Sequence, residues 1–221
     1  GARLGFFNGQ ARVGFGGKFL SEDTKMVFDL LADQLKNPLF AEEDLNKVKK
    51  RQVANYKRSK ESTRGNATNN MLKAFYGTGH QNSPTDPDKA IEEIKKITPK
   101  NLKDFHLKNY GAGTMVIVAV GDVDHNSLES LIKEGFGGWK KSPLKEKKET
   151  GTANKASDKV YVTMQDKTST DFLVGTALGI DRYHPDYLPL YVATHTLGGN
   201  FSARLMQTVR VKEGLTYGIN S

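Results

Sequence analysis

The chain has 221 residues, a formal net charge of +8 and no cysteine. Ordinary domains contain roughly 100–200 residues, so we expect one large domain, or one domain and part of a second. The hydrophobic fraction of 37% and the charged fraction of 26% exclude a disordered or collagen-like chain. Without cysteine, thiolate zinc sites, iron–sulfur clusters and cysteine nucleophiles are excluded as well. The longest apolar run, Met115 to Val120, is far shorter than the roughly 18 residues that a membrane span needs.

The positive charge is concentrated in two stretches. Residues 45–60 contain seven basic residues and no acidic one, and residues 140–159 contain seven lysines and three acidic residues. A nucleic-acid groove more often interleaves aromatic residues with basic ones, whereas here only Tyr56 does so. We therefore interpret the first stretch as a solvated helix face and expect no nucleic-acid partner. A basic binding module that uses Lys47 to Lys60 is a weaker alternative.

The first part of the chain predicts a hairpin followed by several helices. Apolar and small residues alternate around Asn8-Gly9, which predicts a strand hairpin within residues 1–19. Ser21 then has the position of a helix cap before the apolar stripe that begins at Met26 and ends at Asn37-Pro38. Further helices are expected from Ala41, over residues 66–76, from Thr98-Pro99, and from Asp124 to about Phe136.

The remaining elements alternate between strands and helices. Residues 114–121 are rich in valine and isoleucine and predict a buried strand. The polar residues 140–157 predict a linker, because they contain almost no large apolar side chain. Beyond the linker we expect strands at 160–164, 172–178 and 215–219, a helix from Pro185 toward Leu197, and a Ser202-capped helix that ends at Gly214.

The order of strand, polar turn, helix and turn occurs twice. It runs from Val13 to Leu35 and again from Phe172 to Leu197, which suggests a weak internal duplication. The second copy stops about a third of the way through. Because a sheet that ended there would lack strands to bury one face, we expect the native polypeptide to continue past Ser221.

No metal site is predicted from the histidines. None of them stands in a His-x-x-x-His or His-x-x-Glu-His spacing, which is what places two ligands on one face of a helix. A Gly-x-Ser-x-Gly elbow for acyl-serine chemistry is absent too. The sequence therefore offers no catalytic residue of its own.

Residues 197–218 form the most specific segment of the sequence. The glycines at 198 and 199 permit a tight turn, and Gly214 permits a left-handed helix stop, after which the chain turns back. Arg210 and Tyr217 are thereby expected to lie close together, where a guanidinium and a phenol offer donors to a peptide carbonyl or an oxyanion. The alternative is that Arg210 binds helix C-terminal carbonyls and Tyr217 packs, and chemistry alone favours this alternative.

The segment Leu197-Gly198-Gly199-Asn200-Phe201-Ser202-Ala203-Arg204-Leu205, with Arg210 and Tyr217, resembles the signature of the pitrilysin/insulinase-type zinc metallopeptidases. These are the inverted zincins that include mitochondrial processing peptidase. Other pieces agree in order and spacing, namely 31–45, 76–80, 97–99, 109–110, 120–123 and 136–139. The resemblance covers nearly the whole chain except the linker.

The resemblance implies an α+β fold of tandem homologous domains, each an antiparallel or mixed sheet covered by helices, as in the LuxS/processing-peptidase-like metallohydrolase fold. Residues 1–139 would be most of a first domain whose start is missing, 140–157 a linker, and 158–221 the first part of a second domain. The family uses His-x-x-Glu-His and a downstream glutamate as zinc ligands. The motif is absent here, and the basic residues 45–60 repel a dication.

We therefore expect a non-catalytic half of such a peptidase, inactive alone, with no zinc in this chain and zinc in the complete assembly. Its partners would be a peptide substrate and a catalytic half or subunit that carries His-x-x-Glu-His, as a dimer or a fused protein. The resemblance gives Arg210 and Tyr217 the role of substrate-binding residues. The alternative is a structural core subunit of the same fold with no peptidase role. The sequence leaves the cellular compartment open.

Overall fold

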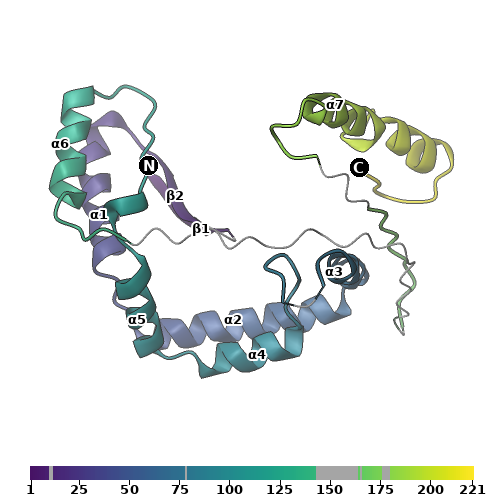
Figure 1. Cartoon of the computed structure of the whole chain (residues 1–221), viewed down its shortest axis with the longest axis horizontal. Coiled ribbons are helices and arrows are strands. Elements are labelled where there is room, and N and C mark those ends of the chain that lie inside the picture. The colour runs from purple at the N-terminus through teal and green to yellow at the C-terminus, as the bar shows by residue number, and fades with distance from the viewer. Residues whose placement is uncertain (10–11, 78, 143–163, 165, 176–179) are drawn as a thin grey trace. The chain divides into compact units, whose positions relative to one another are not determined.

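The computed structural model describes residues 1–9, 12–77, 79–142, 164, 166–175 and 180–221. The chain divides into two compact units, Gly1–Val174 and Gly175–Ser221. Helices make up most of the regular structure, and the sheet that the structure describes has two strands (Figure 1). This arrangement confirms the predicted α+β class. In the part of the chain described, no helix combines the length and the apolar character that a membrane crossing requires.

The predicted hairpin is confirmed. Strands β1 (Arg3–Asn8) and β2 (Val13–Lys18) pair antiparallel, with Phe6 opposite Phe15 and Phe7 opposite Gly14. The ring of Phe7 lies over Gly14, where a Cβ atom would come within 2.3 Å of it. Any other side chain at position 14 would therefore require the half-exposed ring of Phe7 to move.

A pair of helices forms the best-buried part of the first unit. Helix α1 (Thr24–Lys36) packs against α6 (His125–Phe136), and Lys36 Nζ donates a 3.0 Å hydrogen bond to the carbonyl of Gly135. Figure 1 shows the two helices side by side next to the hairpin. The buried cluster between them, called the α1–α6 core below, consists of Phe28, Leu31, Ala32 and Phe136.

The helix α1 begins later than a Ser21 cap predicts. Residues Ser21–Asp23 form a single 3₁₀ turn, and the hydroxyl of Thr24 donates to the carbonyl of Ser21 over 2.7 Å. The predicted cap is therefore wrong, since Ser21 accepts with its main chain and not with its side chain. Asp124 does cap α6, where its carboxylate accepts the N–H of Ser127 over 2.8 Å.

Four helices follow α1 in the chain: α2 (Glu42–Glu61), α3 (Thr63–Tyr76), α4 (Pro87–Lys96) and α5 (Pro99–Asn109). Helix α5 has the expected Thr98-Pro99 start, with a capping box between Thr98 and Asn101. Helix α4 is absent from the sequence-based prediction, although Asp86 before Pro87 is a typical start signal. It packs along α2 and buries Ala90 and Ile91 (Figure 1).

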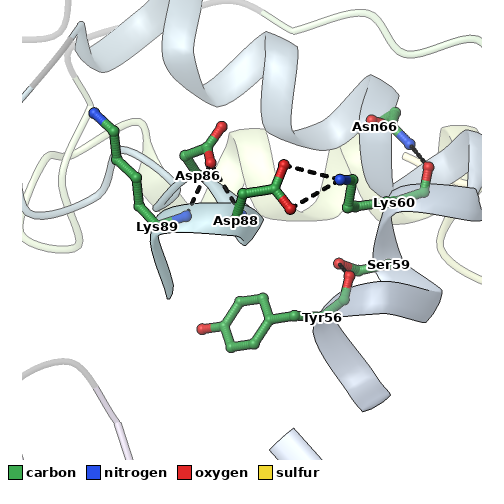
Figure 2. A network of polar contacts seen from close by, with 7 residues as sticks. All are labelled: Tyr56, Ser59, Lys60, Asn66, Asp86, Asp88 and Lys89. Atoms are coloured by element: carbon green, nitrogen blue, oxygen red, sulfur yellow. Dashed lines mark hydrogen bonds and ion pairs between the residues drawn. The ribbon is translucent and has the colours of Figure 1, made fainter. Parts of the chain in front are cut away.

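Polar contacts tie the start of α4 to the end of α2 (Figure 2). Lys60 Nζ bridges both carboxylate oxygens of Asp88, at 2.9 and 2.8 Å. The carboxylate of Asp86 accepts the main-chain N–H groups of Asp88 and Lys89, which lowers the pKa of Asp86; the bond from Lys89 contributes most. The hydrogen bond to Asp88 in turn raises the pKa of Lys60.

The basic stretch of α2 is partly paired within the chain. Lys47 Nζ lies 2.7 Å from the carboxylate of Glu43, and Lys49 Nζ donates to the carbonyl of Lys95 over 3.1 Å. These side chains lie at the surface, where individual ion pairs contribute little to stability. The arrangement agrees with a solvated helix face.

The predicted buried strand at 114–121 is wrong. Residues 115–120 belong to no strand in the described structure, and Val116, Val118 and Val120 are 83, 81 and 95% exposed. Within residues 115–120, Met115 and Ile117 pack against the α1–α6 core. The local pattern of valine and isoleucine favours a strand, but a strand also needs a partner, and no described residue supplies one.

The predicted linker lies mostly outside the described residues, which stop at 142 and resume at 164. Its first residues are packed, since Ser142 is buried and the N–H of Ala112 donates to the carbonyl of Lys140 over 2.9 Å. The strand expected at 160–164 lies outside the described residues except for Met164. Of the strand expected at 172–178, residues 172–175 are described and are not in a sheet.

The second unit contains the expected helix α7 (Tyr187–Gly198), which begins two residues after Pro185. The strand expected at 215–219 is not formed, because these residues pair with no other described strand. The expected helix before Gly214 is present, but it has a different geometry, which determines how Arg210 is held.

Candidate functional site

The turn after α7 brings the end of the chain back to the helix. The N–H of Ser221 donates to the carbonyl of Gly198 over 3.3 Å, and the Ser221 hydroxyl donates to the carbonyl of Thr194 over 2.6 Å. A Cβ atom on Gly198 would lie 2.5 Å from the nitrogen of Ser221. Glycine at this position therefore permits the close approach of the main chain at Ser221.

Asn200, and not Ser202, organises the turn before the next helical segment, whose helical residues begin at Arg204. Its side-chain oxygen accepts the N–H of Ser202 over 2.9 Å, and its carbonyl accepts the N–H of Ala203 over 3.1 Å. The predicted Ser202 cap is wrong, because no described N–H group donates to the side chain of Ser202. Asparagine is among the preferred residues at helix starts.

The segment that follows is π-helical and not α-helical. It covers Met206–Lys212, and the N–H of Glu213 bonds to the carbonyl of Thr208, five residues earlier, over 3.0 Å. The segment ends at Gly214, which has a φ of 65°. The predicted left-handed stop at Gly214 is thus confirmed. Short π-helical turns inside helices are frequent at functional sites.

Arg210 is held from two sides. Its Nη1 donates a 2.7 Å hydrogen bond to the main-chain carbonyl of Tyr217, and its guanidinium carbon lies 5.2 Å from the ring centroid of Phe201. A cation over an aromatic face is attracted by the ring quadrupole. The side chain is half-buried, so its orientation is fixed by these contacts.

Tyr217 presents its phenol to solvent. Its side chain is 94% exposed, and no described residue hydrogen-bonds to the hydroxyl. The structure therefore brings Arg210 and Tyr217 together through the main chain of Tyr217. The sequence analysis expects the guanidinium of Arg210 and the phenol of Tyr217 to point together. In the structure, the hydrogen bond between the two residues goes to the main chain of Tyr217 and not to its phenol.

The arrangement leaves hydrogen-bonding capacity on both side chains. A guanidinium has five N–H donors, and the described structure uses one of them on Tyr217. The exposed phenol adds an O–H donor close by in the chain. The turn fixes the main chain of Arg210 and Tyr217. Their two side-chain donors are therefore suited to bind a carbonyl group or an anion.

A model of the peptidase M16 inactive domain matches residues 96–221, which is more than half of the chain and includes the whole Arg210 segment. The chain belongs to the peptidase M16 inactive-domain family. This confirms the resemblance to pitrilysin/insulinase-type zinc metallopeptidases on which the sequence analysis rests.

Curated relatives match along all or most of the chain. An uncharacterized zinc protease of Mycobacterium tuberculosis is 28% identical over 225 residues, which cover 100% of this chain and 50% of the relative. A protein of Helicobacter pylori named a non-peptidase homolog is 27% identical over 204 residues, covering 91% of this chain and 46% of the relative. The chain thus spans about half the length of the curated relatives that it matches.

A solved structure supports the same assignment. The crystal structure of a peptidase M16 inactive domain from Pseudomonas fluorescens matches with a TM-score of 0.68 and 25% identity. The match covers 100% of this chain and 53% of that chain. The fold of the inactive M16 domain is therefore the fold of this chain.

The described residues do not fit the zinc ion of the M16 peptidases. They contain no group of three His, Asp or Glu side chains that could hold a metal ion. Histidine nitrogens are instead engaged singly: His106 Nε2 bonds to the carbonyl of Leu35 over 2.7 Å, and His80 Nδ1 accepts the N–H of Asn82 over 3.0 Å.

The sequence analysis missed one residue of the site. Phe201 lies within the segment that carries the family resemblance, but no role was assigned to it. An aromatic residue nine positions before an arginine gives no periodic signal for contact on an α-helix. Only the turn at Asn200 and the π-helical segment bring the two side chains together.

Proposed function

We propose that this chain is the non-catalytic half of an M16 zinc peptidase, which supplies substrate contacts to a zinc site carried elsewhere. The catalytic half would bear His-x-x-Glu-His, either as a separate subunit or in the same polypeptide. Because the chain spans about half of its curated relatives, the activity of the whole protein forms part of the proposal. Zinc protease names among the relatives support a zinc site in the complete protein.

The observation that carries the proposal is the fixed position of Arg210. Its guanidinium is anchored at Tyr217 and Phe201, so it does not have to be ordered when a peptide binds. A preorganised donor stabilises charge that develops on a peptide carbonyl during attack, because no reorganisation is needed at that moment. Arg210 and Tyr217 are therefore the proposed substrate-binding residues, with the peptide backbone as their ligand.

The domain organisation remains part of the proposal. Residues 1–139 would belong to a first M16 domain, 140–157 to a linker, and 158–221 to the start of a second, homologous domain. The boundary between the two compact units falls at Val174 and Gly175. The Arg210 segment lies entirely in the second unit.

The test is peptide turnover by the complete zinc-loaded protein. We expect Arg210→Ala to lower kcat/KM on the order of a hundredfold, about 3 kcal/mol, which is typical for the loss of one preorganised donor. Tyr217→Phe removes only the phenolic O–H and should lower turnover as well. Both variants should retain the zinc content of the wild type, because neither residue is a ligand.

Arg204→Ala is the matched control. Arg204 is an exposed arginine of the same segment, and no described residue forms a hydrogen bond or ion pair with its side chain. Its replacement should leave turnover unchanged. Wild-type activity in both Arg210→Ala and Tyr217→Phe would refute the substrate-binding role and leave the family membership as evidence for the fold only.

A second candidate function is structural. The Helicobacter pylori relative is named a non-peptidase homolog, so relatives of this chain include a protein assigned no peptidase activity. In this case the chain would be a core subunit of an assembly and Arg210 would only brace its own turn. Turnover assays separate the two candidates, since the structural one predicts no peptide hydrolysis by the complete protein.

A further inference from the structure

One side of helix α2 packs on its neighbours, and the opposite side is strongly basic. Helix α4 lies along the packed side (Figure 1). The buried and half-buried side chains on that side recur every three or four residues: Leu45, Lys49, Gln52, Val53, Tyr56 and Ser59. The basic pairs Lys50-Arg51 and Lys57-Arg58 are exposed on the opposite side of the helix. These four residues are called the basic ridge below.

The cations of the basic ridge have no anionic partner among the described residues. Arg58 Nη2 donates to the neutral side chain of Asn55 over 2.6 Å. No described residue forms an ion pair with the other three members, Lys50, Arg51 and Lys57. The remaining basic residues of α2 are bound by groups of the chain itself. The ridge is therefore the unneutralised part of the basic stretch.

The stability of α2 does not account for this arrangement. Lys47 precedes Lys50 by three positions and Arg51 by four, so the three side chains are neighbours on the helix surface. Like charges at these spacings destabilise a helix. The helix dipole favours basic residues in the last turn, but Lys50 and Arg51 lie in the middle of α2, where the dipole contributes nothing.

The rest of the chain is poorly suited to neutralise the basic ridge. Residues 143–163, which lie outside the described part, contain five lysines and three acidic residues. The other residues outside the described part are uncharged. Their net charge is positive, so charge complementarity favours an occupant from outside residues 1–221.

We propose that the basic ridge is a docking surface for an acidic segment of another polypeptide. Its two pairs stand seven residues apart, which separates them by roughly 10 Å along the helix axis. The occupant would present carboxylates at this spacing, and the guanidinium groups of Arg51 and Arg58 match carboxylate geometry with paired donors. The proposal concerns binding and does not rest on the peptidase role of the complete protein.

Nucleic acids and membranes fit the basic ridge less well. Surfaces that bind single strands stack bases on aromatic side chains. Tyr56, the aromatic residue of α2, is half-buried on the packed side. A helix that lies in a membrane surface needs an exposed apolar face. Leu45 and Val53 are instead on the side of α2 that packs within the protein.

Binding of a labelled acidic peptide tests the proposal. The probe is a Glu-Ser repeat peptide, its reference is a Gln-Ser repeat peptide, and fluorescence anisotropy is measured with the full-length, chelator-treated protein. We expect only the acidic peptide to bind at low ionic strength, and to be released at about 1 M salt, where the Debye length is about 3 Å. Equal binding of the two peptides, or binding that salt leaves unchanged, would overturn the proposal.

Paired substitutions locate the contact on the protein. Lys50→Gln/Arg51→Gln, and the corresponding change of the other pair, should each weaken binding of the acidic peptide about tenfold. Lys103→Gln/Lys108→Gln is the matched control, because it removes the same charge from exposed positions of α5. Its affinity should stay within about twofold of the wild type. Equal losses in all three variants would show that only the net charge attracts the peptide, against the proposal.

Two further measurements separate docking from other roles. Lys50→Gln/Arg51→Gln relieves repulsion between like charges, so the midpoint of urea denaturation should not decrease. A lower midpoint would assign the pair a structural role and contradict the proposal. A thymidine oligonucleotide should bind more weakly than the acidic peptide. Tighter binding of the oligonucleotide, with the same dependence on the basic ridge, would make the surface a nucleic-acid site and overturn the assignment.

Discussion

Arg210 donates a 2.7 Å hydrogen bond to the main-chain carbonyl of Tyr217, across a turn at which Gly214 has a φ of 65°. The relationship ties a side chain of the π-helical segment to the main chain that follows it. It fixes the guanidinium of Arg210 and leaves the phenol of Tyr217 free in solvent. The proposed substrate contacts thus differ in kind: one donor is preorganised, and the other must be ordered by the substrate.

Phe201 should act on turnover through Arg210. Replacing Phe201 by leucine keeps an apolar side chain but removes the aromatic face under the guanidinium. Exposed cation–π contacts contribute about 0.5–1 kcal/mol, so we expect kcat/KM of the complete zinc-loaded protein to decrease roughly two- to fivefold. Phe201→Tyr preserves the ring face and should restore activity. A Phe201→Leu effect that persists when Arg210 is already alanine would contradict this positioning role.

Gly214 should be sensitive to any side chain. Its φ of 65° lies in the left-handed region, so Gly214→Ala should destabilise the protein by about 1 kcal/mol, as measured by urea denaturation. Gly218→Ala is the matched control, because nothing lies within 4 Å of a Cβ built there and its φ is not left-handed. Equal stability of the two variants would show that the turn at Gly214 does not require its observed conformation.

The cap of α4 should make stability depend on pH. Hydrogen bonds from the main-chain N–H groups of Lys89 and Asp88 lower the pKa of Asp86, so its native pKa lies below that of the unfolded chain. Such a carboxylate stabilises the fold above its unfolded pKa, and this contribution is lost as the pH falls through the native pKa. The Tm difference between wild type and Asp86→Ala should therefore be largest above about pH 5 and vanish in acid.

Asp23 provides the control for this pH series. It also stands at a helix start, but its side chain makes no capping hydrogen bond. The Tm difference between wild type and Asp23→Ala should therefore not show the decrease in acid that is expected for Asp86→Ala. A Tm difference for Asp86→Ala that stays constant from neutral pH to acid would rule out the carboxylate cap as the cause.

Elements that depend on neighbouring residues could be predicted from the sequence. The hairpin at Asn8-Gly9, the helix start at Thr98-Pro99 and the left-handed stop at Gly214 are each encoded within a few residues. Local signals fix such turns because the conformational preferences of glycine, proline and capping side chains act over one turn. Helix α4 carries the same kind of signal at Asp86-Pro87 and was predictable for the same reason.

Features that depend on distant partners could not be predicted. The valine-rich segment 115–120 has the composition of a strand, but strand formation depends on a partner that no local pattern specifies. The pairing of Arg210 with Phe201 depends on the π-helical geometry of Met206–Lys212, which differs from an α-helix only in the choice of hydrogen-bond acceptor. The direction of the Tyr217 phenol is likewise set by the turn and not by its position in the motif.

Zinc analysis of this chain tests the central claim most directly. The protein comprising residues 1–221 would be treated with a chelator, reloaded with zinc and dialysed, and its metal content and peptidase activity would be measured. The absence of a ligand cluster among the described residues and the carboxylate-free stretch 45–60 predict no stoichiometric zinc and no peptide hydrolysis. One tightly held zinc per chain, with hydrolysis that a chelator abolishes, would contradict the assignment of this chain as the non-catalytic half.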